Sequence, residues 1–199
     1  LETIPVCHAL EQDPRFFTLL LQIDRELAAL TQAGGCACSG RLHCADYPRK
    51  PRGVATEWRA GFERRFSFCC SVCRKRTTAE SVRFLGRRVY LALVVVLSSS
   101  RHAGSNSGTA AVRCAVAVPL RTLERWRSWW QEAFIATPLW RGAGGSFMPP
   151  LDAAGLPANL LERFVGDAVA RLSGLLRWLG PLTVRAADPA AEITAEHAA

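Results

Sequence analysis

The chain has 199 residues, of which 49% are hydrophobic, and a formal net charge of +8. This length and apolar content suffice for one compact domain or two small ones, and they exclude a disordered tail. The longest strongly apolar run, residues 89–97, is about half as long as a membrane span requires, and the first ten residues lack the pattern of a signal peptide, so we expect a cytoplasmic protein without a membrane partner.

The N-terminal part of the chain predicts one amphipathic helix. Residues 13–33 place their apolar side chains on one face at the helical period. Asp13 can cap this helix, Pro14 suits its first turn, and a pair of glycines ends it. We therefore assign residues 1–34 to an N-terminal amphipathic helix.

The positive charge is concentrated in the middle of the chain. Residues 36–101 contain fourteen Lys and Arg against four Asp and Glu, a net charge of +10, whereas residues 1–35 carry −3 and residues 151–199 carry −2. Such a basic block is typical of a surface that binds a polyanion, because Lys and Arg displace the counterions condensed on phosphates. A solvated basic face without a ligand is the alternative.

Residues 35–83 lose the helical period and contain two pairs of thiols, Cys36 with Cys38 and Cys70 with Cys73. Zinc prefers four soft ligands in a tetrahedron, and two turns that each present two sulfurs supply them. We therefore predict a zinc-ribbon-like basic module with some β-structure over residues 35–83, in which these four cysteines hold Zn²⁺. A degenerate site without metal and a redox or catalytic use of the thiols are the alternatives.

The first pair departs from the usual spacing, because one residue and not two separates its cysteines. Either both sulfurs bind in a cramped turn, or His43 or Cys44 replaces one of them. Neighbours on a strand point to opposite faces, and an isolated cysteine is usually a small buried hydrophobe. We therefore expect the remaining cysteines to be bystanders: Cys7, Cys69 and Cys114.

Basic side chains surround both pairs. Two prolines keep residues 45–55 extended, so we expect Arg49, Lys50 and Arg52 to lie along phosphates or to enter a minor groove. A merely soluble loop is the alternative. Further basic residues expected to contact DNA are Arg74, Lys75, Arg76, Arg87 and Arg88.

Residues 84–140 are expected to form a helical domain. The apolar run over residues 84–100 predicts a buried helix, although its valines would also suit a central strand. Residues 101–109 predict a loop, and residues 119–136 predict a long helix rich in tryptophan. We expect the tryptophans of this region in the core, and not as stacking platforms for bases: Trp126, Trp129, Trp130 and Trp140.

Residues 109–130 match the spacing of buried positions in a helix-turn-helix, in which two short helices share one small core. Pro119 suits the first turn of the second helix, which would expose Arg121, Thr122 and Arg125 to DNA. The positions expected in the shared core are Val112, Val116, Val118, Leu123 and Trp126.

The string "AVPLRTLERW" is similar to the recognition-helix segment of bacterial transposases and site-specific regulators. A zinc ribbon followed by such a helix pair resembles the DNA-binding half of insertion-sequence proteins, and "LHCADYPRKPRG" and "SVRFLGRRVYLALVVVL" are similar to uncharacterised bacterial proteins associated with mobile elements. The resemblance covers roughly residues 36–130. It implies a zinc-dependent DNA-binding accessory or regulator of a mobile element, with duplex DNA as its partner and a transposase or recombinase as a second one.

A zinc-ribbon module that binds proteins within a larger nucleic-acid-processing complex is the alternative function. The sequence has no acidic triad on strand ends, no glycine-rich phosphate loop and no nucleophile elbow, so we expect a protein that is not an enzyme. A hydrolase with an incompletely coordinated zinc is a third hypothesis.

The C-terminal part predicts a linker over residues 141–150 and one amphipathic helix over residues 156–180. We assign residues 141–185 to a C-terminal helix that packs on the helical domain, and residues 186–199 to a flexible tail. The expected fold is therefore mainly α, with a small β zinc-ribbon module and a helix-turn-helix helical domain.

Overall fold

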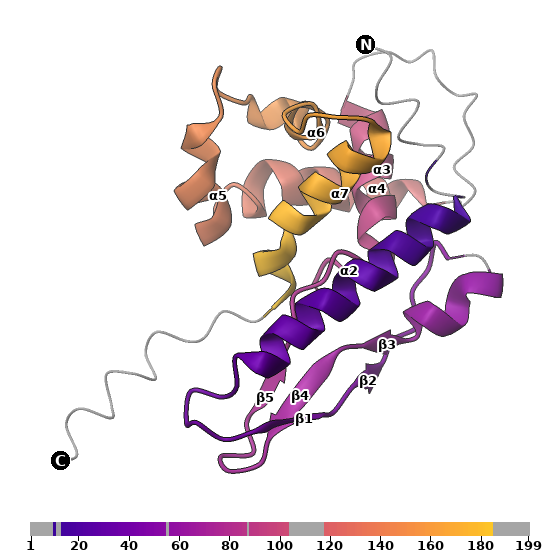
Figure 1. Ribbon diagram of the computed structural model, residues 1–199. Coiled ribbons are helices and arrows are strands. Elements are labelled where there is room, and N and C mark those ends of the chain that lie inside the picture. Colours follow the sequence, from indigo (N-terminus) through magenta and orange to yellow (C-terminus); the bar gives the residue numbers. More distant parts are fainter. Residues whose placement is uncertain (1–9, 11–12, 55, 87, 104–117, 185–199) are drawn as a thin grey trace.

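The structure of the protein, a computed structural model, describes residues 10, 13–54, 56–86, 88–103 and 118–184 (Figure 1). Helices predominate, and a small antiparallel sheet lies beside helix α2. The expectation of a mainly helical fold with a small β part is confirmed. The predicted tail and two of the expected bystanders, Cys7 and Cys114, lie outside the described residues.

Helix α2 (Pro14–Ala33) forms as the sequence predicts. The side chain of Asp13 accepts a hydrogen bond of 2.8 Å from the N–H of Arg15, and Pro14 occupies the first turn. After the helix, Gly35 adopts a positive φ of 69°, which turns the chain toward the sheet. The apolar face of α2 is buried: Phe16, Phe17, Leu20, Ile23 and Ala28.

Three short strands form an antiparallel sheet in the order β1-β4-β5. Leu42 pairs with Cys70, and both are buried on the face of the sheet that packs near Ala28 of α2. The opposite face carries a cross-strand row that includes His43 and Arg76. The strands are β1 (Leu42–Cys44), β4 (Ser67–Cys70) and β5 (Arg76–Thr78).

A second, two-stranded sheet continues the β part, with Tyr47 opposite Arg65. The chain between its strands contains one 3₁₀ helix, although the sequence gives no helical period there. Phe62 at the end of this helix packs edge-on against Phe17 of α2, with ring centroids 5.5 Å apart. The elements are β2 (Tyr47–Pro48), the 3₁₀ helix η2 (Thr56–Phe62) and β3 (Arg64–Arg65).

A buried ion pair connects α2 to the segment after the sheet. Asp24 Oδ2 lies 2.6 Å from Arg83 Nε, and neither side chain is more than 1% exposed. Asp24 also accepts hydrogen bonds from the Ser81 hydroxyl at 2.5 Å and from the N–H of Val82 at 2.7 Å. Arg83 donates in addition to the carbonyl of Gly61. These bonds fix the β part of the molecule to the middle of α2.

The apolar run expected to form a helix over residues 84–100 becomes helical only at Ala92, where α3 (Ala92–Ala103) begins. Gly86 has a φ of 62°, which interrupts any helix that starts before it. Residues 89–91 are held extended by Arg52, whose N–H donates to Val89 at 2.8 Å and whose carbonyl accepts from Leu91 at 3.0 Å. The helical interpretation is thus correct for the second half of the run, whereas Tyr90 and Leu91 in its first half are extended and form isolated β-bridges.

The helix predicted over residues 119–136 consists of α4 (Leu120–Ser128) and a π-helix, η3 (Trp129–Ala133), that continues it. Trp126 and Trp130 are buried in the core, as expected, whereas Trp129 and Trp140 pack against it only partly buried. The first helix of the predicted helix-turn-helix lies largely outside the described residues, including its core positions Val112 and Val116.

The C-terminal part differs from the prediction in two ways. Residues 141–150 are not simply a linker, because a helix and a 3₁₀ turn occupy their first half. The single helix expected over residues 156–180 is wrong, because Gly166 has a φ of 105° and the side chain of Asp167 caps a new helix by accepting from Ala170 at 2.8 Å. The elements are α5 (Pro138–Ala143), η4 (Gly144–Ser146), η5 (Ala153–Gly155), α6 (Ala158–Leu161), α7 (Ala168–Trp178) and η6 (Gly180–Thr183).

Two hydrophobic clusters hold these elements together. The main core joins the first half of α2 to α3, α4, α6 and α7, which gather on one side of α2 in Figure 1. The smaller cluster, here called the sheet core, contains Ala28, Leu42, Phe68, Cys70 and Ala79. Among the described helices, none is long and apolar enough to cross a membrane.

Candidate metal centre

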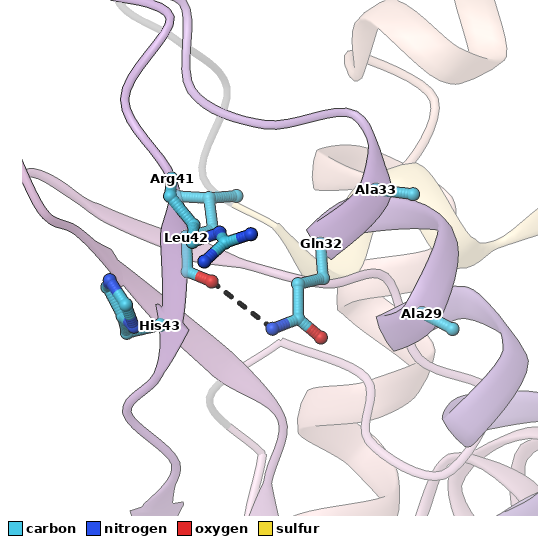
Figure 2. Close-up of a pocket in the computed structure, with 6 residues that line it drawn as sticks. All are labelled: Ala29, Gln32, Ala33, Arg41, Leu42 and His43. Atoms are coloured by element: carbon cyan, nitrogen blue, oxygen red, sulfur yellow. Dashed lines mark hydrogen bonds between the residues drawn. The ribbon is translucent and has the colours of Figure 1, made fainter.

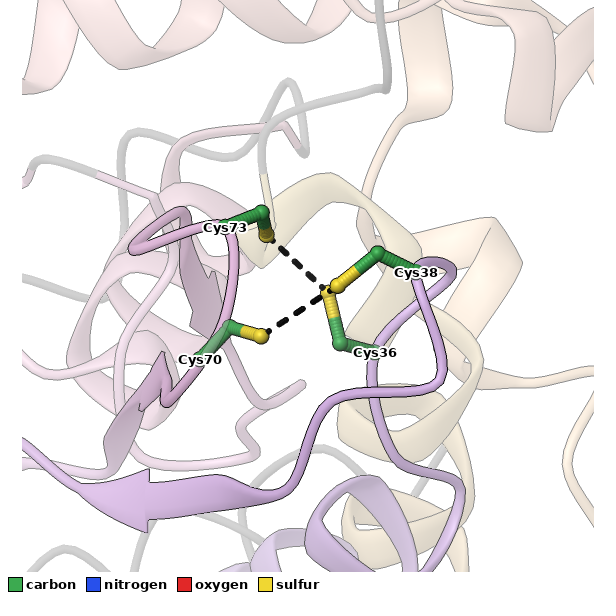
Figure 3. A group of neighbouring side chains, drawn as sticks. All are labelled: Cys36, Cys38, Cys70 and Cys73. Atoms are coloured by element: carbon green, nitrogen blue, oxygen red, sulfur yellow. Dashed lines mark hydrogen bonds between the residues drawn. The ribbon is translucent and has the colours of Figure 1, made fainter.

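The four cysteines predicted as metal ligands lie together between two turns of the chain, as Figure 3 shows. The Sγ atoms of Cys36, Cys38, Cys70 and Cys73 all lie within 4.8 Å of one another. Cys36 Sγ is 3.5 Å from Cys73 Sγ, and Cys38 Sγ is 3.4 Å from Cys70 Sγ. Each of these contacts joins the turn before β1 to the turn after β4, so the two turns face each other.

This arrangement fits a metal ion such as zinc. Four thiolates at about 2.3 Å from a tetrahedral Zn²⁺ lie about 3.8 Å from one another, close to the separations found here. The shortest contact, 3.4 Å, is far longer than the bond of about 2.05 Å in a disulfide. Four soft sulfur donors also leave no open coordination position, which is the pattern of a structural and not a catalytic zinc.

The first turn is shaped by Ser39 and Gly40. Ser39 has a φ of 61°, and its N–H donates a hydrogen bond of 2.8 Å to the carbonyl of Cys36. A Cβ on Gly40 would lie only 2.5 Å from Cys70 Sγ, which would push the two turns apart. Glycine is therefore required at this position, because the backbone passes directly beside a ligand sulfur.

The second turn ends in the same way. Arg74 has a φ of 59° and directly follows Cys73, as Ser39 directly follows Cys38. Within the turn, the N–H of Val72 donates to Cys70 Sγ at 3.4 Å. The two turns therefore share a left-handed residue after their second cysteine, although the first turn is one residue shorter. This shared geometry shows how a pair with one intervening residue can present both sulfurs.

Backbone N–H groups and neighbouring sulfurs set the acidity of the thiols. Burial raises the pKa of Cys70, but the N–H groups of Cys73 and Val72 and the adjacent sulfurs lower it more, to about 6. The N–H of Lys75 lowers the pKa of Cys73, but burial and the three other sulfurs raise it more, to about 12. The N–H of Gly40 lowers the pKa of Cys38. The cluster thus holds negative charge near neutral pH, which a divalent cation would neutralise.

The substitute ligands considered from the sequence do not lie in this group. His43 and Cys44 are exposed on β1, and neither is among the four clustered residues. Cys69 follows the expected alternation, because it shares the outer face of the sheet with His43 and Arg76 while Cys70 is buried on the inner face. The structure therefore brings together the two cysteine pairs predicted from the sequence, and not the substitutes His43 and Cys44.

Several predicted DNA contacts lie beside the metal centre. Arg74, Lys75 and Arg76 are exposed at the second turn and the start of β5. Arg41, immediately before β1, is also exposed, and it was not among the predicted contacts. With His43 it lines a pocket of about 560 Å³ between β1 and the last turns of α2 (Figure 2). Its position two residues before His43, on the other side of the buried Leu42, is the sequence signal that could have identified Arg41.

The other predicted contacts lie elsewhere in the molecule. Arg49 is engaged internally, because its Nη2 donates to the carbonyl of Arg88 at 2.8 Å and its guanidinium lies 5.3 Å from the centroid of the Phe84 ring. Lys50, Arg52, Arg121 and Arg125 are exposed, whereas Arg88 and Thr122 are half-buried. Arg87 lies outside the described residues.

Comparison with known proteins adds no further information about this site. No protein-family model matches the chain, and neither a curated protein nor a solved structure matches it.

Proposed function

We propose that this protein is a zinc-dependent DNA-binding protein, in which a zinc ribbon holds a basic surface against duplex DNA. The observation that carries the proposal is the convergence of four thiols between two turns whose neighbouring residues include Arg41, Arg74 and Lys75. A metal bound there would fix the positions of these cations relative to one another. The resemblance to insertion-sequence proteins supports a role as an accessory or regulator of a mobile element, beside a transposase or recombinase.

The sheet core is too small to hold this surface in shape without help. It contains five buried residues, and only Leu42 and Phe68 among them are large. Small modules of this size usually depend on a metal or a disulfide, because they bury too little apolar surface. Zinc coordination would supply the missing free energy and would keep the two turns together.

The basic surface is defined here as the exposed side chains of Arg41, Arg74, Lys75 and Arg76. Residues 36–48 and 67–78, which include both turns and the three strands, contain a single acidic residue, Asp46. That carboxylate accepts a hydrogen bond of 3.0 Å from the N–H of Ser67. Among the described residues, none of the four cations of this surface forms an ion pair. Arg76 donates to the Ala45 carbonyl and to the Ser67 hydroxyl, so Arg41, Arg74 and Lys75 are the cations most available to phosphates.

The test measures the salt dependence of duplex DNA binding by the zinc-loaded chain. Removing three phosphate contacts lowers the slope of log K against log salt by about 0.9 per contact. The variant R74Q/K75Q/R76Q should therefore lose up to about 2.7 units of slope and well over tenfold in affinity at low salt. A control of equal charge carries its three substitutions on exposed helical arginines: R127Q, R141Q and R177Q.

The control should retain most of the affinity and the slope. Equal losses of DNA affinity in both triple variants would show that net charge alone accounts for the binding, and would reject the proposed surface. Salt-insensitive binding, or none, would reject DNA as the partner. The metal requirement is checked with Cys70→Ser, which should lower the bound zinc and the DNA affinity together.

A protein-interaction module is a second candidate, favoured by one observation. Val72, at the tip of the second turn between Cys70 and Cys73, is 69% exposed and offers an apolar contact to a partner protein. A defined protein complex that survives nuclease treatment and is lost in Val72→Ser, without retention of DNA, would favour this function over the first.

A further inference from the structure

A second pocket is separate from the metal centre, because none of the four cysteines lines it. It has a volume of about 590 Å³, within the range of small-molecule sites. Its walls come from Arg52, from the segment that precedes α3, and from one face of α4 with the start of η3. The lining residues are Arg52, Arg88, Val89, Tyr90, Thr122, Arg125, Trp126 and Trp129.

Backbone pairing places one wall of this pocket. Arg52 forms a parallel bridge with Tyr90, through the hydrogen bonds to Val89 and Leu91 described above. Its side chain therefore emerges beside Tyr90, and its guanidinium lies 5.8 Å from the centroid of that ring. A residue of the basic strip between the cysteine pairs is thus brought to the helical part of the molecule.

Helical periodicity places the other wall. Thr122, Arg125, Trp126 and Trp129 are spaced by three, one and three residues, so they follow one stripe along α4 into η3. Trp126 packs edge-on against Tyr90 with ring centroids 5.1 Å apart, and both of these side chains are buried. Trp129 is only half-buried, so it keeps an accessible surface.

The chemistry of the walls is cationic and aromatic. The Arg88 guanidinium lies 3.8 Å from the centroid of the Trp129 ring, a stacking distance. Burial, together with repulsion from Arg125, lowers the pKa of Arg88 to about 10, so its side chain stays charged at neutral pH. No carboxylate is among the described lining residues, and within the described part of the chain none of the three arginines forms an ion pair.

We propose that this arginine–aromatic pocket binds one unpaired nucleotide, with its phosphate between the guanidiniums of Arg52, Arg88 and Arg125 and its base against the exposed part of Trp129. Inorganic phosphate would leave the exposed part of Trp129 uncovered, and an apolar ligand would leave three cations unpaired. A base within a duplex is stacked and cannot reach a pocket wall, so the nucleotide is either free or part of a single strand. The inference rests on the proposed function, because it names a second nucleic-acid contact of the same protein.

The test titrates the full zinc-loaded chain with deoxyadenosine monophosphate and follows tryptophan fluorescence and calorimetric heat. The nucleotide should bind and change the fluorescence. Arg125→Gln and Arg52→Gln, both on exposed side chains, should each weaken binding on the order of tenfold, the effect of one lost hydrogen bond to a charged group. The control R127Q removes the same charge from the same helix outside the pocket and should leave binding unchanged.

Further probes identify the source and the class of the ligand. If a single-stranded hexanucleotide binds at least tenfold more tightly than the mononucleotide, and the same variants weaken it, the natural ligand is a nucleotide within a single strand. If the two probes bind equally, the natural ligand is a free nucleotide. Equal affinity for inorganic phosphate or for phosphotyrosine, an equal effect of R127Q, or no binding of either nucleotide probe would overturn the proposal.

The two proposals fail separately. Duplex binding without any nucleotide binding rejects only the pocket. Nucleotide binding that depends on Arg125, in a protein that does not retain duplex DNA, rejects only the duplex function.

Discussion

Neutralising Asp24 should strongly destabilise the protein, because its carboxylate is the only charge that faces the buried guanidinium of Arg83 at ion-pair distance among the described residues. In Asp24→Asn the side chain keeps its size, but one of its two oxygens becomes an NH₂ group. At least one of the three donors on Asp24 then loses its acceptor, and Arg83, which is 1% exposed, loses its counter-charge. Removing one partner of a buried ion pair costs about 3–5 kcal/mol.

Urea unfolding of the zinc-loaded chain, followed by circular dichroism, measures this cost. A loss of this size is a large fraction of a typical stability of about 5–15 kcal/mol, and it corresponds to a decrease in Tm of about 10 °C for a chain of this length. The matched control is Glu26→Gln on the same helix, because Glu26 is 55% exposed and its ion pair with Arg177, at 3.9 Å, contributes little. If Asp24→Asn lowers the free energy of unfolding by less than about 1 kcal/mol, the stabilising role assigned to the Asp24–Arg83 ion pair is refuted.

Three further predictions concern the metal centre. Gly40→Ala should weaken zinc binding on the order of tenfold or more in a chelator competition, because the new Cβ would meet Cys70 Sγ at 2.5 Å, whereas Gly145→Ala, which meets no atom within 4 Å, should not. Arg74→Gly should raise the free energy of unfolding of the zinc-loaded chain by about 0.5–1 kcal/mol, because glycine adopts the φ of 59° without strain; an unchanged or lower value would count against a strained turn. Zinc affinity should rise at least about tenfold per pH unit between pH 6.5 and 7.5, because Cys73, with a pKa of about 12, must lose its proton to bind the metal; a flat profile would contradict thiolate ligation.

The metal ligands and the first helix could be predicted because both depend on short-range patterns. The thiol pairs restrict the ligand set to a few combinations, and only the choice among Cys36, Cys38 and the substitutes on β1 stayed open. The choice of Cys36 and Cys38 depends on the left-handed conformation of Ser39, and serine at this position does not predict such a conformation. Helix α2 begins and ends as predicted because Asp13 and the glycine pair act through the local backbone.

The features that the sequence did not predict depend on contacts between distant segments. Asp24 occupies the apolar stripe of α2, and this position was the only local sign that it would be buried; its partner, Arg83, is 59 residues away. Arg49 resembles a solvated cation in the sequence, but two backbone carbonyls bind its side chain. The break between α6 and α7 had a local signal, since Gly166 and Asp167 are a stop and a cap, but the continuous apolar period concealed it.

Helix α2 contributes to both hydrophobic clusters. Its first half belongs to the main core, and Ala28 in its second half belongs to the sheet core. The cysteine-bearing sheet should therefore not fold independently. A fragment that starts at Gly34 would lack α2, whose Ala28 packs against the sheet. Zinc removal should accordingly destabilise the whole helix. The arginine–aromatic pocket and the metal centre should unfold in one cooperative transition.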